Sequence, residues 1–282
     1  MQLGKNNRLI VKREADISYL LTDGEVEIFL HKKEAERPYV VGEEIDVFLY
    51  DDNQGRVTAS TKPPSLIIGG IALLEVVSVN FNYGAFLYYG MIKDLLLSLD
   101  DLPKNKRLWP QANDKMFVSM QEKNNRLFAK VLTRHELTES FEDLEVLEKD
   151  EKYDAYVMYL IENGYLAYSE AGHEIFIHKN NIREEARIGK KVSVKIIAQN
   201  EKGNYSGTLI EQKEIMLDKD ANIVFEYLEN HGGIMPYTDK SDAADISKVF
   251  HMSKSAFKRA LGHLYHLKKV ELNKDNTKLV GE

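Results

Sequence analysis

The segment 27–32 reads Glu-Ile-Phe-Leu-His-Lys, and almost the same six residues recur at positions 174–179 as Glu-Ile-Phe-Ile-His-Lys. An ordered series of matches at one offset indicates an internal duplication. The offset of 147 residues is kept downstream, with one inserted residue before the last match, in three further pairs of segments: 41–42 and 188–189, 44–49 and 191–196, and 55–60 and 203–208.

A third and weaker copy lies between these two. Lys93–Ser98 takes the place of the strand that ends in His, Asp114–Met120 takes the place of the alternating segment, and Asn125–Val131 follows as its hairpin partner. Each copy alternates apolar and polar residues between turns rich in Asp, Asn and Gly, a pattern typical of short antiparallel strands. A unit of about seventy residues usually protects its sheet edges by closing into a five-stranded barrel.

The chain changes character after about residue 212. Apolar residues at helical spacing predict helices over 218–230, 241–250 and 253–267, the last one capped by Ser253. Two short alternating segments between Val270 and Val280 then predict a hairpin. Three helices followed by a hairpin is the order of a winged helix.

Charge is distributed unevenly. The chain has 38 basic and 45 acidic residues and a net charge of −7, which excludes a basic protein that coats nucleic acid. The segment 246–270 nevertheless contains six Lys or Arg and no acidic residue, and a second basic cluster, 104–109, contains the only Trp. A polyanion would therefore have to bind locally. The absence of Cys excludes a disulfide scaffold and a thiol nucleophile, and it favours a cytoplasmic location.

Several of these features resemble a known domain. The segment Asn82-Tyr83-Gly84-Ala85-Phe86-Leu87, the strand that ends in His and the Gly-Arg turn at 55–56 are similar to the S1 RNA-binding domain. With three such copies and the final segment 252–262, the chain resembles the conserved virulence factor B family of bacterial RNA-binding proteins. The resemblance implies a mainly β multidomain fold, with three tandem five-stranded OB-fold (S1-like) barrels over 1–62, 63–139 and 140–212 and an α+β winged helix over 213–282.

The resemblance also implies binding of single-stranded RNA and a role in post-transcriptional regulation of gene expression, including virulence genes. Unstacked bases regain stacking on exposed aromatic rings, while cations meet the phosphates. The candidate RNA-binding residues are aromatic, basic or His side chains of the three copies: Phe29, His31, Tyr83, Phe86, Tyr88, Lys93, Lys104, Lys106, Arg107, Trp109, Tyr168, Phe176, His178 and Lys179.

The copies differ in how much of this pattern they keep. Ser98 replaces the His in the middle copy, so that contact is expected to be absent there. In the third copy Asn163 and Leu166 stand at the two aromatic positions, while Tyr168 corresponds to Tyr88. The first copy keeps Phe29 and His31 but has no Gly-aromatic element, because Asp23–Val26 is short and acidic. The alternative for each lone aromatic residue is that its side chain belongs to the barrel core, and the side chains of His31 and His178 could equally have a structural role.

The winged helix adds a second candidate contact. Ser253, Lys254, Lys258 and Arg259 lie in the first half of the last helix, where winged helices contact nucleic acid. DNA is therefore a possible partner, although a winged helix also binds RNA or protein. An operator-specific regulator and a protein-interaction scaffold remain the alternative functions.

Signals of an enzyme are weak. The chain lacks a Walker loop, a G-x-S-x-G elbow, a H-E-x-x-H pair and a G-x-G-x-x-G turn. His263 and His266 have a spacing that could chelate a metal, but no carboxylate accompanies them, and a pair on a helix surface is the commoner explanation. We expect no catalytic activity, cofactor, metal or membrane association, and the oligomeric state stays open.

Overall fold

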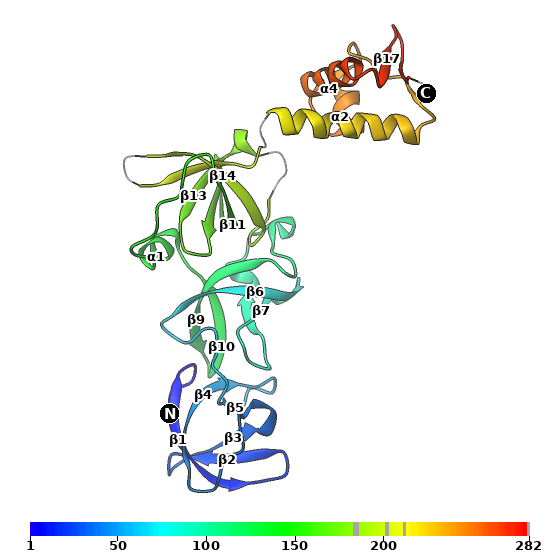
Figure 1. Ribbon diagram of the computed structural model, residues 1–282. Helices are drawn as coiled ribbons and strands as arrows, with labels where there is room; N and C mark the ends of the chain where they lie inside the picture. The colour runs from blue at the N-terminus through cyan, green and yellow to red at the C-terminus, as the bar shows by residue number, and fades with distance from the viewer. Residues whose placement is uncertain (183–185, 201–202, 211–212, 281–282) are drawn as a thin grey trace. The chain divides into compact units, whose positions relative to one another are not determined.

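A computed structural model describes residues 1–282 apart from 183–185, 201–202, 211–212 and 281–282 (Figure 1). Contacts divide the chain into two compact units, Met1–Leu209 and Ile210–Glu282. The first unit holds three closed five-stranded barrels, and the second holds helices and a three-stranded sheet. The predicted mainly β multidomain class, with three barrels before a winged helix, is confirmed.

All three barrels have the same strand order, in which the first strand is followed around the barrel by the second, third, fifth and fourth. The third and fifth strands pair in parallel, and the other pairs are antiparallel. The strands of the first barrel are β1 (Asn6–Glu14), β2 (Ser18–Thr22), β3 (Glu27–His31), β4 (Glu44–Asp51) and β5 (Val57–Ser60). Those of the middle barrel are β6 (Ile71–Asn80), β7 (Gly84–Tyr88), β8 (Leu95–Ser98), β9 (Lys115–Lys123) and β10 (Arg126–Val131). Those of the third are β11 (Lys152–Ile161), β12 (Gly164–Ser169), β13 (Glu174–His178), β14 (Lys191–Gln199) and β15 (Tyr205–Thr208).

The alternating pattern of the sequence becomes the inside and outside of each barrel. In β1, Leu9 and Val11 are buried in the barrel core while Ile10 is exposed. In β3, Leu30 is buried while Phe29 is exposed. Successive side chains of a strand point to opposite faces of the sheet, so one face of every strand supplies the core and the other is left for contacts outside it.

Strand pairing identifies the counterpart of β7 in the first barrel. Ser18 pairs with His31 as Gly84 pairs with Ser98 in the middle barrel, so β2 is that counterpart. The segment Asp23–Val26 forms the turn between β2 and β3, where Asp23 accepts hydrogen bonds from the N–H groups of Glu25 and Val26.

A buried carboxylate joins the first barrel to the middle one. Asp51 accepts a hydrogen bond of 2.9 Å from the backbone N–H of Leu127 and forms an ion pair with Lys93. Beside it, Phe48 and Tyr50 point out of the first barrel and pack into the core of the middle barrel. These contacts bury apolar surface between the barrels, and they hold the outer faces of the two barrels in a defined relation.

The middle and third barrels are joined by a bidentate ion pair and by backbone hydrogen bonds. Arg187 donates to both oxygens of Asp114, at 2.7 and 2.9 Å, and the N–H of Lys115 donates to the carbonyl of Gly189. A short helix, α1 (Arg134–Glu139), lies in the connection. Its first turn is fixed by a capping box between Thr133 and Glu136.

The second unit has the elements of a winged helix, which are α2 (Lys213–Asn230), β16 (Ile234–Met235), α3 (Ala243–Phe250), α4 (Lys254–His266), β17 (Val270–Leu272) and β18 (Thr277–Leu279). The three predicted helices and the hairpin are present, and Ser253 caps α4 by accepting from the N–H of Ala256 at 3.2 Å. Strand β16, only two residues long, was not predicted. Among the described residues, no helix combines the length and apolar character that a bilayer crossing requires.

Candidate nucleic-acid interface

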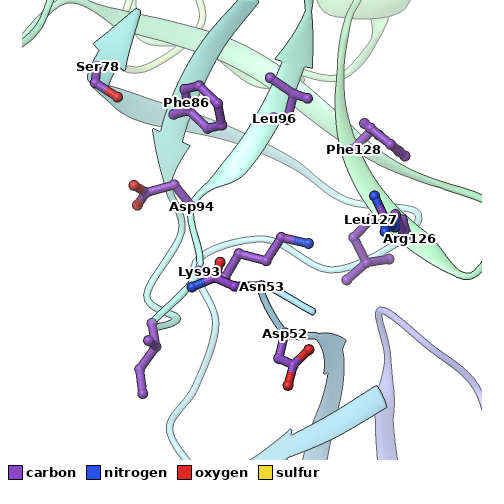
Figure 2. Close-up of a pocket in the computed structure, with 11 residues that line it drawn as sticks. Asp52, Asn53, Ser78, Phe86, Lys93, Asp94, Leu96, Arg126, Leu127 and Phe128 are labelled. Atoms are coloured by element: carbon purple, nitrogen blue, oxygen red, sulfur yellow. The ribbon is translucent and has the colours of Figure 1, made fainter. Parts of the chain in front are cut away.

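A row of apolar side chains crosses the outside of the middle barrel from strand to strand. Phe86 of β7 pairs with Leu96 of β8, which in turn pairs with Phe128 of β10. All three are half-buried and line a groove of about 410 Å³, which Figure 2 shows. Phe86 and Phe128, which lie on either side of Leu96, offer ring faces on which unstacked bases stack, with about 1–3 kcal/mol per base.

Charged side chains of both signs surround this row. Arg126, on the right in Figure 2, is exposed and lies against the β4–β5 turn of the first barrel, where its guanidinium approaches Gly55. Lys93, a predicted phosphate contact, is instead engaged in the ion pair with Asp51. Asp94 also lines the groove, and burial raises the pKa of its carboxyl.

The first barrel has its own groove, which meets the groove of the middle barrel. Phe29, 57% exposed, lines it together with His31, Tyr50 and the exposed Ile17. Asp52 and the exposed Ile92 line both grooves, so the two surfaces are continuous across the barrel junction. At this point Arg56 forms an ion pair with Asp52, with 2.6 Å between Nη2 and Oδ2.

The recurring His of the repeats has a structural role. The Nδ1 atoms of His31 and His178 each accept a hydrogen bond from the backbone N–H two residues later, at 3.0 and 3.2 Å. The hydroxyl of Ser98 accepts the equivalent bond at 3.3 Å. Each residue thereby caps the short 3-10 helix that follows its strand, namely η1 (Lys32–Glu34), η2 (Leu99–Asp101) and η4 (Lys179–Asn181). The replacement of His by Ser therefore preserves the cap.

The Gly of the Gly-aromatic element is also required by the fold. Gly84 and Gly164 have φ values of +134° and +147°, which side chains rarely adopt. A Cβ atom at Gly84 would lie 1.9 Å from the carbonyl oxygen of Leu97, and one at Gly164 would lie 2.0 Å from that of Ile177. The element is recognisable in the sequence because two strands approach closely here.

The third barrel presents a different surface. Tyr168, which corresponds to the exposed Tyr88, has an exposed fraction of 0%. It packs in a cluster with Leu132, Leu137 and Leu166, where α1 covers the counterpart of the middle groove. The expectation that Tyr168 offers a stacking face is therefore wrong, because a helix from the preceding connection occupies the space that a base would need.

Polar contacts fix this cover. Arg134 of α1 donates to both carboxylate oxygens of Glu174, at 2.8 and 2.6 Å, and the Tyr168 hydroxyl donates to the same carboxylate at 2.5 Å. Phe176 is half-buried against the cluster, and its ring lies edge-on to His178, 6.1 Å between centroids. Lys179 remains exposed in η4.

The basic cluster of the middle copy is folded onto aromatic rings. Trp109 is only 4% exposed and donates its indole N–H to the carbonyl of Pro103 at 2.6 Å. The expectation that Trp109 stacks on a base is therefore wrong, because its ring is buried. The Lys106 ammonium lies over the rings of Phe81 and Trp109, at 5.4 and 5.7 Å from their centroids. Phe81 is the exposed ring of this pair. Lys104 and Arg107 are exposed nearby in the chain.

The other two predicted aromatics of the middle barrel are accessible. Tyr83 lies in the turn between β6 and β7 and Tyr88 at the end of β7, and they are 60% and 53% exposed. Together with Phe86 they place three aromatic rings on one strand and its entry turn.

The predicted cations of the winged helix are exposed on α4. Lys254 and Lys258 lie about one helical turn apart, Arg259 follows Lys258 directly, and all three side chains are exposed. Lys258 has one acidic neighbour, Asp239, at 3.8 Å. Ser253 serves as the N-cap, so its hydroxyl is already used within the helix.

Sequence reasoning missed several residues of the continuous groove: Ile17, Ile92, Arg126 and Phe128. The signal for two of them was present, because alternation within β10 places Arg126 and Phe128 on the same face. Among the described residues, no group of three or more His, Asp or Glu side chains is arranged to hold a metal ion.

Three segments of the chain are similar to known domain families. Family models match at residues 3–62 (S1 domain), 72–130 (CvfB first S1-like domain) and 222–279 (CvfB-like winged helix domain). The S1 domain is a nucleic-acid-binding domain, and the chain thus carries domains of this class.

Similar proteins cover nearly the whole chain. The uncharacterized protein YitL of Bacillus subtilis is 34% identical over 94% of this chain and 89% of its own length. Conserved virulence factor B of Staphylococcus saprophyticus is 33% identical over 80% of this chain and 76% of its own length. A crystal structure of a multidomain protein with nucleic acid binding domains from Streptococcus pneumoniae is 26% identical and aligns with a TM-score of 0.69 over 99% of this chain and 98% of that chain. Relatives that are 33–34% identical cover most of the chain, and family models match two of the barrels and the winged helix. The chain belongs to the conserved virulence factor B family.

Proposed function

We propose that this protein binds single-stranded RNA, without catalysing a reaction on it, and acts in the cytoplasm in post-transcriptional control of gene expression. The observation that carries the proposal is the row Phe86, Leu96 and Phe128, which continues into the groove of Phe29 on the first barrel. The match of residues 3–62 to the S1 domain, a nucleic-acid-binding domain, supports the proposal.

A single strand fits this groove better than a duplex does. The groove exposes aromatic rings rather than a row of Lys and Arg side chains. Only unstacked bases can stack on such rings. Duplex bases already stack on each other and would gain nothing from Phe86 or Phe128. The neutral balance of charges around the groove fits bases, whereas phosphates need cations such as Arg126 at its rim.

The winged helix would supply much of the salt-dependent affinity. Removing one Lys or Arg that meets a phosphate of single-stranded nucleic acid lowers the slope of log affinity against log salt by about 0.7. Lys254→Ala combined with Arg259→Ala should therefore reduce that slope by about 1.4, while leaving base stacking on the barrels in place.

Filter binding to single-stranded RNA across a salt series tests the proposal. Phe86→Ala combined with Phe128→Ala should weaken binding by roughly tenfold or more at every salt concentration, since each lost stack is worth about 1–3 kcal/mol. Val40→Ala, which truncates an exposed side chain of the first barrel outside both grooves, is the matched control.

Two results would contradict the proposal. One is an absence of RNA affinity at low salt. The other is an affinity that changes neither with the Phe double variant nor with the Lys254 and Arg259 double variant. Tighter binding to duplex DNA than to RNA in direct competition would favour the operator-binding alternative instead.

A further inference from the structure

The groove of the middle barrel is lined by a carboxylate, that of Asp94. Asp94 lies just before β8 and lines the groove beside Phe86, as Figure 2 shows. It is half-buried, and no hydrogen bond or ion pair to it occurs within the described ranges of the chain. The neighbouring Lys93 is turned to Asp51 and does not neutralise it.

A carboxylate at this place is unsuited to the sugar-phosphate backbone. It repels phosphates, and partial burial makes its charged form more costly unless hydrogen bonds compensate it. An ionised carboxylate only accepts hydrogen bonds, through two oxygens. The ligand group that satisfies it is therefore a neutral edge with N–H donors.

The nucleobases differ in how well they meet this requirement. Guanine presents two adjacent donors, N1–H and the N2 amino group, and can bind both oxygens of one carboxylate. Uracil presents one N–H between two carbonyl oxygens, and those carbonyls would face the carboxylate unfavourably. Phe86 lies beside Asp94, so a base that stacks on the ring brings its edge to the carboxyl group.

We infer that Asp94 makes the middle barrel selective for guanine over uracil in single-stranded RNA. This inference rests on the proposed function, since it needs a base in the groove. The loss of a bidentate contact changes discrimination between bases by about tenfold. Inosine, which lacks the N2 amino group of guanine, should fall between the two.

Fluorescence anisotropy with four nine-nucleotide RNAs tests the inference, using oligouridine and versions with one central guanosine, inosine or adenosine. The full-length protein should prefer guanosine by about tenfold. Asp94→Asn keeps one acceptor oxygen and adds an N–H donor, a pair that complements the N–H and neighbouring carbonyl of uracil and of guanine alike, so the preference should be lost. Asp94→Ala should remove it as well.

Asp100→Asn is the matched control, because Asp100 is an exposed carboxylate of the same barrel that does not line the groove. It should keep the preference for guanosine. Equal affinity for all four RNAs, or a preference that persists in both Asp94 variants, would overturn the inference while leaving RNA binding intact. An absence of binding to every RNA would overturn the proposed function itself, and circular dichroism of each variant separates loss of folding from loss of selectivity.

Discussion

The cover on the third barrel should be removable by one substitution in α1. Leu137 is fully buried between Leu132 and Tyr168, and it is the only residue of this six-residue helix that is buried. Leu137→Ala removes these contacts and leaves a cavity, which in protein cores costs about 2–5 kcal/mol. This is comparable to what a single short helix can gain from docking, so α1 should detach locally.

The loss should be local because the barrel does not depend on α1 for its own core. The interior of the third barrel is a separate cluster that contains Val157, Ala167 and Ile177. We therefore expect faster backbone hydrogen exchange over residues 134–140 and in β12, measured by mass spectrometry, with little change in β14. Chemical nitration of Tyr168 should rise in the same variant, because its ring loses its cover.

His135→Ala is the control, since His135 is an exposed residue of the same helix, with its Nδ1 3.4 Å from the carboxylate of Glu139. It should leave exchange and nitration unchanged. If hydrogen exchange and Tyr168 nitration in Leu137→Ala were the same as in the protein without this substitution, the apolar contact of Leu137 would not hold α1 in place. That result would refute the argument from burial.

Three further predictions concern stability. Asp51→Ala should lower the free energy of unfolding of the first unit by about 3–5 kcal/mol in urea denaturation, because Lys93 and the Leu127 N–H lose a buried partner; an effect no larger than that of Asp52→Ala would contradict this. Burial alone would raise the pKa of Glu174, but the hydrogen bonds from Arg134 and Tyr168 outweigh it and hold the pKa below 4.5. The stabilisation is thus present above pH 4.5 and disappears as the pH falls through the lower folded value, so the protection of α1 against hydrogen exchange, relative to the intrinsic rate at each pH, should fall in acid, and Glu174→Gln should abolish that pH dependence. Gly262→Ala should stabilise the winged helix by about 0.5–1 kcal/mol, since a Cβ atom there meets nothing within 4 Å and Gly is a poor helix former; a lower melting temperature would count against it.

The sequence predicts the barrels well because their interior imposes a period of two on every strand. Strands β3 and β13 could be aligned from their residues alone, and the helices of the second unit follow from caps and apolar spacing. The surface is harder to predict, because exposure depends on segments far apart in the chain. Tyr168 is covered by a helix that begins more than thirty residues earlier, and Trp109 is buried under its own loop.

Phe128 is the opposite case, a residue of the groove that sequence reasoning did not identify. Its alternation with Arg126 is visible in the sequence, yet its place in the groove depends on the parallel pairing of β10 with β8, which is a property of the closed barrel. Local patterns specify which face of a strand points outward. They do not specify which neighbours that face will have.

The caps formed by His31, Ser98 and His178 bear on how tandem domains diverge. Because an imidazole nitrogen and a hydroxyl oxygen accept the same backbone N–H, selection on folding keeps an acceptor at this position and lets its identity drift. The residue by which the copies are most easily aligned therefore has a structural role in all three copies, which holds independently of any ligand. Binding preference can evolve on the outward row of each barrel, where the middle copy has Phe86 and the first and third copies have Leu20 and Leu166, so a copy can acquire its own partner without loss of the barrel fold.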